Sequence, residues 1–167
     1  MPTESQKQTI KLYNNWFKTA RSKQLKRRGD WNIWLILAGR GWGKTRTGAM
    51  DIILYALMNP NVRCAVVAPT SGDLRRVCFE GVSGIVNNIP YDCYKDGINS
   101  YNKSTSEIEL FNGSKIMGFS ASEPDRFRGS QYHRAWCDEL ASWRYPDAFD
   151  QLQFGMRLGV RPQTLIT

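Results

Sequence analysis

Apolar and polar positions along the middle of the chain predict strands and helices in alternation. Residues 33–38 (IWLILA) and 63–68 (RCAVVA) are short apolar runs, typical of buried strands in a parallel sheet. Residues 44–58 between them carry apolar side chains at helical spacing. A second helix is predicted from Ser71, and its apolar face would consist of Leu74, Cys78, Val82, Ile85 and Ile89. This order predicts an α/β fold with a mainly parallel central sheet flanked by helices.

A hairpin is predicted further along the chain. Residues 107–111 and 115–119 are expected to form two strands joined at Asn112-Gly113, a pair that favours a tight type I′ turn. The other predicted elements are a loop over 90–106, a polar segment over 120–130, a strand over 133–137, a helix over 145–154 and a strand from Thr164. The sequence given ends inside this last strand.

Length and composition favour one globular domain. The chain has 167 residues, of which 41% are apolar and 12% aromatic, enough to bury a substantial core. No apolar run approaches the roughly 20 residues of a transmembrane helix, and the N-terminus lacks the apolar core of a signal peptide. The four cysteines show neither CxxC pairing nor zinc-ligand spacing. We therefore expect reduced thiols in a cytosolic protein without a membrane partner.

Positive charge is concentrated in residues 1–28. The net charge of the chain is +8, and this segment holds one acid, Glu4, and the basic residues Lys7, Lys11, Lys18, Arg21, Lys23, Lys26, Arg27 and Arg28. Apolar side chains recur at helical spacing at Ile10, Tyr13, Trp16, Phe17 and Ala20. An amphipathic basic helix is predicted. It can pack on the domain through its aromatic stripe, or it can contact a polyanion such as DNA, and charge alone does not decide.

The stretch AGRGWGKT, residues 38–45, has the form of a phosphate-binding P-loop. It departs from the strict pattern because Ala38 stands where the first glycine is usual. A strand, a glycine-rich turn and a helix follow one another, so loop amides and the helix N-terminus can hold a phosphate. Lys44 would reach the β- and γ-phosphates of ATP, and the Thr45 hydroxyl would bind Mg²⁺. The predicted nucleotide-binding residues are Gly39, Arg40, Gly41, Trp42, Gly43, Lys44, Thr45 and Arg46.

Two adjacent carboxylates follow the predicted strand 133–137. Asp138 would hold the Mg²⁺ ion and Glu139 would orient and deprotonate the attacking water, a division of labour found in ATPases. The alternative is a surface acidic pair that begins a turn. Together with the P-loop, the pair favours ATP hydrolysis over phosphoryl transfer to a small molecule, so kinases and GTPases are less favoured.

Three arginines are candidates for stabilising the charge on the γ-phosphate. Arg40 lies inside the P-loop and could act on the nucleotide of its own chain. Arg126 and Arg128 lie in the polar segment EPDRFRGS and could reach a neighbouring subunit. For Arg126 a surface salt bridge is the favoured interpretation.

The segments WLILAGRGWGKTRTGA, VVAPTSGDLRRVCFEG, FSASEPDRFRGSQYHRAWCDELASW and FGMRLGVRPQTLIT resemble, in this order, the large terminase subunits of tailed bacteriophages and gene transfer agents. The resemblance covers about residues 29–167. It implies a RecA-like P-loop ATPase domain of the additional-strand (ASCE) class, acting as a ring on a procapsid portal in the host cytoplasm. It also implies ATP-driven translocation of double-stranded DNA and a small terminase subunit as partner.

The resemblance also assigns roles to particular residues. Lys44 and Thr45 match the Walker A residues, and Asp138 and Glu139 match Walker B and the catalytic glutamate. Arg40 would be the arginine that acts in cis. The resemblance further implies that Arg128 acts in trans on the adjacent subunit.

Two family features are expected to be missing from this sequence. The Thr-rich coupling motif would begin near Thr167, and the C-terminal nuclease domain would lie beyond it. DNA cleavage is therefore not expected, and ATP hydrolysis by this domain alone would be weak.

The predicted domain division is a basic helical region at 1–28 and an ATPase domain at 29–167. Alternatives are a helicase-like or other RecA-like translocase, and a nucleotide-gated DNA-binding or assembly module without turnover.

Overall fold

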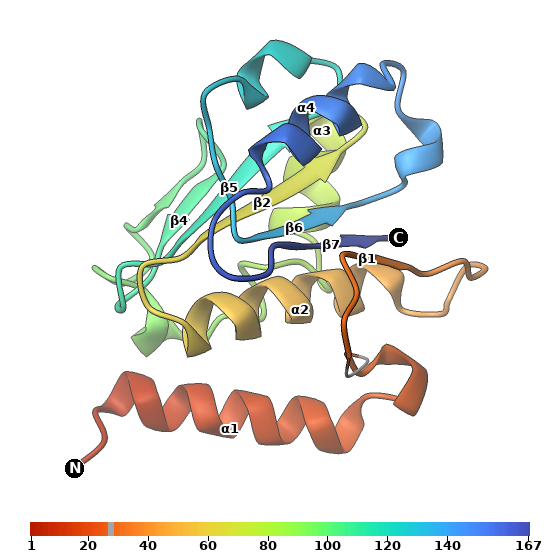
Figure 1. Ribbon diagram of the computed structural model, residues 1–167. Coiled ribbons are helices and arrows are strands. Elements are labelled where there is room, and N and C mark those ends of the chain that lie inside the picture. Colours follow the sequence, from red (N-terminus) through yellow and green to blue (C-terminus); the bar gives the residue numbers. More distant parts are fainter. Residues whose placement is uncertain (27–28) are drawn as a thin grey trace.

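A twisted sheet runs through the middle of the molecule, and helices cover both of its faces (Figure 1). The computed structural model describes residues 1–26 and 29–167. The strands are β1 (Ile33–Leu35), β2 (Arg63–Ala68), β3 (Tyr101–Asn102), β4 (Glu107–Glu109), β5 (Lys115–Ser120), β6 (Arg134–Cys137) and β7 (Gln163–Ile166). The helices are α1 (Glu4–Thr19), α2 (Lys44–Met58), α3 (Ser71–Asp73) and α4 (Asp147–Gly155), with a π-helix at Leu74–Phe79 and 3₁₀ turns at Ser22–Gln24, Tyr91–Cys93, Pro124–Phe127 and Leu140–Ser142.

The strand order β1-β7-β6-β2-β5-β4-β3 confirms the predicted fold class. Strands β1, β7, β6, β2 and β5 are mutually parallel, whereas β4 is antiparallel to β5 and β3 is antiparallel to β4. Strand β7 lies between β1 and β6, with Ile166 opposite both Leu35 and Cys137. This inserted strand separates the strand before the P-loop from the strand before Asp138, which is the additional-strand arrangement. Because these strands are parallel, both segments leave the sheet at the same edge.

Burial of β2 on both faces creates two hydrophobic layers. Cys64, Val66 and Ala68 point to the side of α1 and α2, while Ala65 and Val67 point to the side of α4. Successive side chains of a strand alternate between faces, so a continuous apolar run fits a strand covered on both sides. Figure 1 shows α2 directly against one face of the sheet and α1 stacked outside α2.

Strand β1 is shorter and more exposed than the run 33–38 predicts. Regular pairing ends at Leu35, although the Ile36 amide still donates to the Ile166 carbonyl at 2.9 Å. Ile33 and Leu35 are 47% and 53% exposed. These side chains are exposed because β1 is an edge strand in the described part of the chain and the face to which they point has no helix over it.

The segment after Ser71 differs most from prediction. A single turn of α3 passes into the π-helix, and Val82, predicted on the apolar face, is 91% exposed. Leu74, Cys78, Ile85 and Ile89 are buried as predicted. Gly81 and Gly84 allow the change of path, because added Cβ atoms there would lie 2.6 and 2.7 Å from backbone carbonyl oxygens.

The hairpin of β4 and β5 is confirmed, but its turn is not type I′. Gly113 has φ +79°, whereas Asn112 keeps a negative φ. The Gly113 amide donates to the Leu110 carbonyl and the Leu110 amide to the Ser114 carbonyl, which makes a three-residue loop with a bulge. The Asn112 side chain instead donates to the carbonyls of Ala56 and Leu57 at the end of α2, at 2.9 and 3.2 Å. This tertiary capping contact overrides the local turn preference.

Helix α1 packs through only part of the predicted aromatic stripe, since Trp16 and Ala20 of the stripe contact the core. Thr9 and Trp16 are buried, whereas Ile10, Tyr13 and Phe17 are 56%, 41% and 58% exposed. The helix begins with a capping box in which the Thr3 hydroxyl accepts from the Gln6 amide. The basic residues Arg27 and Arg28 of the predicted segment lie outside the described residues.

Other boundaries agree with prediction to within a few residues. Helix α2 and strand β2 begin and end as predicted, and the boundaries of β6, α4 and β7 differ from prediction by at most two residues. The region 90–106, predicted as loop, contains a 3₁₀ turn and the short strand β3. All four cysteines are free, as predicted, and all four are buried. No helix among the described residues is long and apolar enough to cross a membrane.

Candidate functional site

The P-loop leaves β1 and enters α2 through glycines that adopt a left-handed backbone. Gly41 has φ +76°, and Gly43, the residue before α2, has φ +86°. Residues with a side chain are strained in this region, so the turn requires glycine at both positions. The predicted loop geometry is therefore present although Ala38 interrupts the strict pattern.

Lys44 is the first residue of α2 and its side chain folds back over the loop. Its Nζ donates to the carbonyls of Ala38 and Gly39 at 2.6 and 3.4 Å. The ammonium also lies close enough to Asp138 to lower the pKa of that carboxyl. Lys44 thus stands between the loop and the acidic pair, where a phosphate-binding lysine is expected.

The 3₁₀ turn Ser22–Gln24 braces the P-loop from outside. Gln24 is buried and its Nε2 donates to the Thr47 hydroxyl at 3.2 Å and to the Trp42 carbonyl at 3.4 Å. Arg21 donates to the same carbonyl and its guanidinium lies 5.3 Å from the centre of the Trp42 ring. An added Cβ at Gly43 would lie 2.8 Å from Gln24 Nε2. No spacing signal in the sequence identifies this contact of Gln24 with the loop.

Asp138 follows β6 and is 6% exposed. Its Oδ1 accepts a hydrogen bond from the Thr167 hydroxyl at 2.9 Å, and its Oδ2 accepts one from the Cys78 thiol at 3.7 Å. Burial raises the pKa of the Asp138 carboxyl above its ordinary value and the neighbouring Glu139 raises it further, against the lowering effect of Thr167, Cys78 and Lys44. A hydroxyl such as that of Thr45, a carboxylate and phosphate oxygens are ligands that suit Mg²⁺.

Glu139 is exposed and its backbone is left-handed, with φ +47° and ψ +48°. This conformation is uncommon for a residue with a side chain and costs about 1–3 kcal/mol. The Glu139 amide donates to the Thr167 carbonyl at 2.7 Å, which helps to hold the strained turn. The sharp turn lets Asp138 point into the protein while Glu139 reaches solvent.

One cavity of about 600 Å³ brings the predicted groups together. It is lined by every predicted nucleotide-binding residue of the loop and by Asp138 and Glu139. The opposite wall was not predicted from the sequence and consists of Arg76, Val77, Gly81, Val82 and Ser83. The signal available for this wall was its position just after β2, because β2 lies beside β6 and ends at the same edge.

The arginines of the loop have different surroundings. The Arg46 guanidinium donates to Asn88 Oδ1 at 3.0 Å and lies 5.9 Å from the Trp16 ring centre, so it is held at the rim of the cavity. Arg40 is exposed at the tip of the loop and lines the same cavity.

Arg128 does not line this cavity. It follows the 3₁₀ turn Pro124–Phe127, its side chain is 70% exposed, and it pairs with Asp125 at 3.2 Å. Arg126 pairs with Glu123 at 3.5 Å, in agreement with the surface salt bridge favoured for it. The structure therefore does not bring Arg128 together with Lys44 and Glu139 within one chain.

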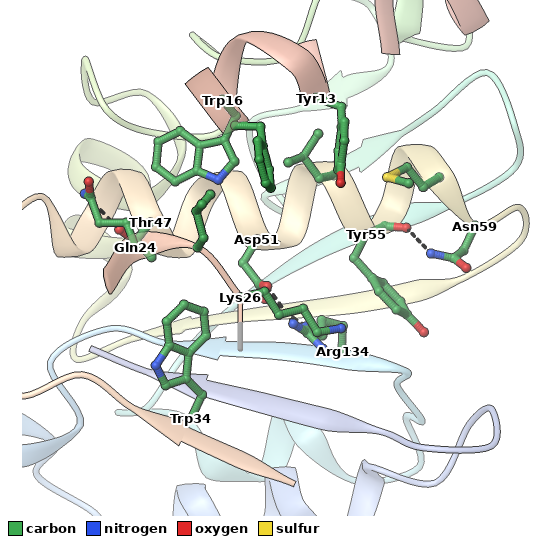
Figure 2. Close-up of a pocket in the computed structure, with 14 residues that line it drawn as sticks. Tyr13, Trp16, Gln24, Lys26, Trp34, Thr47, Asp51, Tyr55, Asn59 and Arg134 are labelled. Carbon is green, nitrogen blue, oxygen red and sulfur yellow. Dashed lines mark hydrogen bonds and ion pairs between the residues drawn. The ribbon is translucent and has the colours of Figure 1, made fainter. Parts of the chain in front are cut away.

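A second cavity, of about 500 Å³, lies between α1, α2 and β1. Figure 2 shows Trp16 and Trp34 on its two sides and the Asp51–Arg134 pair across its floor. Arg134 Nη2 and Nε donate to the two Asp51 oxygens at 2.6 and 2.8 Å, and both side chains are buried. This pair joins α2 to β6, the strand that leads to Asp138.

The topology, with one strand inserted between the strands that lead to the P-loop and to Asp138-Glu139, defines an α/β nucleotide-binding domain of the P-loop type. Residues 35–167 match the family described as terminase large subunit, T4likevirus-type, N-terminal. The chain belongs to this family. No curated protein matches the chain.

Solved structures of phage large terminases share the fold. The large terminase of a thermophilic bacteriophage, in complex with ADP, aligns with a TM-score of 0.59 at 15% identity, over 96% of this chain and 38% of that one. The ATP-gamma-S complex of the same phage enzyme aligns with a TM-score of 0.57 at 14% identity, over 96% of this chain and 37% of that one. The ATPase domain of the Thermus phage P74-26 large terminase aligns with a TM-score of 0.54 at 16% identity, over 81% of this chain and 58% of that one. The chain thus spans between 37% and 58% of these proteins.

Proposed function

We propose that this chain is the ATPase motor domain of a viral large terminase, which hydrolyses ATP to drive double-stranded DNA into a procapsid. The observation that carries the proposal is the single cavity lined by P-loop residues 39–45 and by Asp138-Glu139. Family membership supports it, as do the ADP and ATP-gamma-S complexes of the thermophilic phage enzyme.

Each group has a defined part in this proposal. The amides of the loop and the Lys44 ammonium bind the β- and γ-phosphates, and Thr45 and Asp138 hold Mg²⁺. The ion, when bound, neutralises charge on the phosphates. Glu139 accepts the proton of the attacking water and Arg40 stabilises charge on the γ-phosphate of its own chain.

The proposed trans role of Arg128 requires a second subunit. Its exposed side chain and its place outside the cavity suit a group that completes the site of a neighbour in a ring. Its pairing with Asp125 is exposed and therefore weak enough to exchange for a phosphate. The portal and the small terminase subunit are the further proposed partners, in the host cytoplasm.

The DNA-binding surface we propose includes α1. Lys7, Lys11 and Lys18 are exposed and spaced so that they share one stripe of the helix, on the side opposite Thr9 and Trp16. Such a stripe can follow a phosphate backbone and release counterions. The division into a basic region at 1–28 and an ATPase domain at 29–167 remains part of the proposal.

The test is phosphate release from ATP by the purified chain and by its Lys44→Ala variant, with Mg²⁺ present. We expect hydrolysis that increases with protein concentration, since subunits must meet, and at least a ~100-fold loss in the variant because a principal phosphate contact is removed. Circular dichroism of both proteins controls for folding. Equal rates in the two proteins would disprove the site. ATP binding without turnover, even at high concentration, would favour a nucleotide-gated assembly module instead.

A further inference from the structure

Arg76 lines the nucleotide cavity from the wall opposite the P-loop. Among the described residues that line this cavity, it is the cation that comes from outside the 39–46 segment. The cavity thereby collects Arg40, Lys44, Arg46 and Arg76 against the two carboxylates Asp138 and Glu139. An excess of positive charge in one cavity suits a polyanionic ligand.

The helix that carries Arg76 is fixed to the acidic end of the cavity. Cys78, two residues further on, is buried and its thiol donates to Asp138 Oδ2 at 3.7 Å. Leu74 and Phe79 anchor the same π-helix in the core. The segment that carries Arg76 is therefore held beside the carboxylate that we assign to Mg²⁺, and Arg76 lines the same cavity as that carboxylate.

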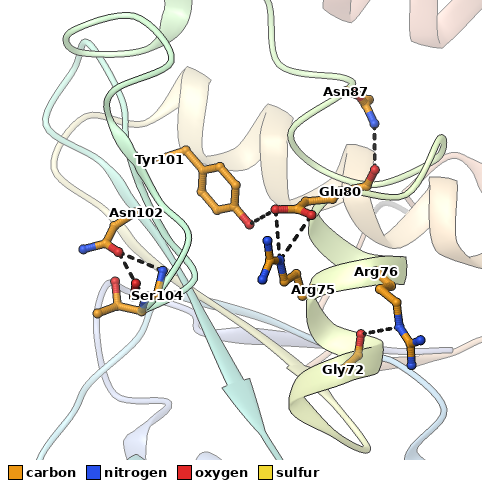
Figure 3. Close-up of polar contacts among 9 residues, drawn as sticks. Gly72, Arg75, Arg76, Glu80, Asn87, Tyr101, Asn102 and Ser104 are labelled. Atoms are coloured by element: carbon orange, nitrogen blue, oxygen red, sulfur yellow. Dashed lines mark hydrogen bonds and ion pairs between the residues drawn. The ribbon is translucent and has the colours of Figure 1, made fainter.

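Arg76 is available for a ligand in a way that its neighbour Arg75 is not. Arg75 Nε donates to both Glu80 oxygens at 3.2 Å, and Glu80 also accepts from the Tyr101 hydroxyl at 3.3 Å. Arg76 Nε makes a long bond of 3.4 Å to the Gly72 carbonyl and has no carboxylate partner in the described part of the chain. Figure 3 shows the two side chains leaving the helix on different sides, Arg75 toward Glu80 and Arg76 toward Gly72.

Gly72 leaves room for this position of the guanidinium. A Cβ added to Gly72 would lie 3.2 Å from Arg76 Nη2, closer than an ordinary contact. A planar guanidinium with free Nη groups can bind two phosphate oxygens at once.

We propose that Arg76 binds the terminal phosphates of the nucleoside triphosphate, opposite the P-loop, and makes the site prefer ATP over ADP. This proposal rests on the proposed ATPase function, because it needs a nucleotide in the cavity. It assigns to the segment after β2 a role in sensing the γ-phosphate.

The test compares the affinities of the purified chain, with Mg²⁺, for a slowly hydrolysed ATP analogue and for ADP, measured by calorimetry. Arg76→Ala should weaken binding of the analogue by about 10-fold to 100-fold, the loss typical of one charged hydrogen bond. Its affinity for ADP should stay close to that of the parent. Arg76→Lys, which keeps the charge and loses the planar fork, should be intermediate.

Arg75→Ala is the matched control, since it removes the adjacent arginine from the other side of the same helix turn. It should bind both nucleotides as the parent does. If Arg76→Ala also binds both nucleotides as the parent does, the proposal is overturned. An equal loss for both nucleotides with a lower melting temperature would overturn it too, since that result indicates a structural role.

Two further outcomes separate this proposal from others. If the parent protein binds neither nucleotide and Lys44→Ala behaves identically, the proposed function itself fails. If Arg76→Ala binds nucleotide normally but loses affinity for a double-stranded DNA oligomer, Arg76 belongs to a DNA surface and the phosphate role is wrong.

Discussion

The Thr167 hydroxyl donates a hydrogen bond of 2.9 Å to Oδ1 of Asp138. The same hydroxyl accepts from Trp136 Nε1 at 2.9 Å, and the Trp136 ring packs directly against Gly48 of α2. Thr167, which directly follows the inserted strand β7, thus holds the carboxylate at the end of β6 and connects it to the helix that follows the P-loop. The Thr167 hydroxyl therefore connects the end of β7 to the end of β6 and, through the Trp136 ring, to helix α2.

Thr167→Val should destabilise the chain by about 1–3 kcal/mol, because the buried Trp136 Nε1 loses its acceptor and Asp138 loses a donor. Urea unfolding followed by tryptophan fluorescence measures the loss. Thr167→Ser keeps the hydroxyl and should retain most of the stability. If Thr167→Val proves as stable as Thr167→Ser, the hydroxyl does not have the structural role described here.

Asp138→Asn should raise stability at neutral pH and abolish Mg²⁺-dependent hydrolysis. Burial raises the pKa of Asp138 in the folded state, so its ionised form is disfavoured by folding. The free energy of unfolding of the parent is lowered by the full cost of burying this charge when the pH is above the pKa of Asp138 in the folded state. This cost disappears as the pH falls below the pKa of Asp138 in the unfolded state, because the carboxyl is then neutral in both states.

The difference in melting temperature between this variant and the parent should therefore be largest at neutral pH and shrink on acidification. Thermal unfolding in the absence of Mg²⁺, at a series of pH values, measures it. A variant less stable than the parent at neutral pH would contradict the prediction.

Asp51→Ala should destabilise the chain by about 3–5 kcal/mol, since it leaves the buried Arg134 guanidinium without its counter-charge. Arg134→Met added to Asp51→Ala should recover much of that loss, because no unpaired charge then remains. Denaturant midpoints of the parent, the single and the double variant provide the comparison. A double variant no more stable than the single one would show that the unpaired charge is not the cause.

Arg128→Ala subunits should bind ATP normally and hydrolyse it slowly, because the residue lies outside the cavity of its own chain. Glu139→Ala subunits lack the proposed base and should also be slow. In a mixture, an Arg128→Ala site can receive Arg128 from a Glu139→Ala neighbour, so part of the activity should return. Absence of rescue at every mixing ratio would refute the trans role.

Replacement of Lys7, Lys11 and Lys18 by glutamine should weaken binding to double-stranded DNA and reduce its salt dependence. If all three contact phosphates, the slope of log K against log salt should fall in magnitude by about 2.7. These side chains are exposed, so the fold should be unaffected. Fluorescence anisotropy over a range of salt concentrations measures the slope. An unchanged slope would remove α1 from the DNA-binding surface.

The sequence predicted the parts of the site that depend on neighbours in the chain. The P-loop lies between its strand and helix, and α2 spans the predicted residues. Glycines that tolerate a left-handed backbone and an apolar repeat are local signals. Asp138-Glu139 was found in the same way, from a strand followed by two acids.

Contacts between distant segments could not be predicted in this way. Asn112 was expected in a tight turn, yet its side chain caps α2, which lies far earlier in the chain. Val82 was expected in the core, yet the glycines on either side allow it to face solvent. Gln24 and Arg76 reach the site from segments in which no residue spacing marked them as part of it.

The sequence by itself determined the family, the order of the strands and helices around the P-loop, and the identity of the principal charged groups. Tertiary structure decided which of these groups share a cavity. Insertion of β7 between β1 and β6 brings Thr167 to Asp138, and the place of β2 beside β6 brings Arg76 opposite the P-loop. The physical reason is that local patterns fix backbone conformation, whereas strand order and packing depend on burial across the whole chain.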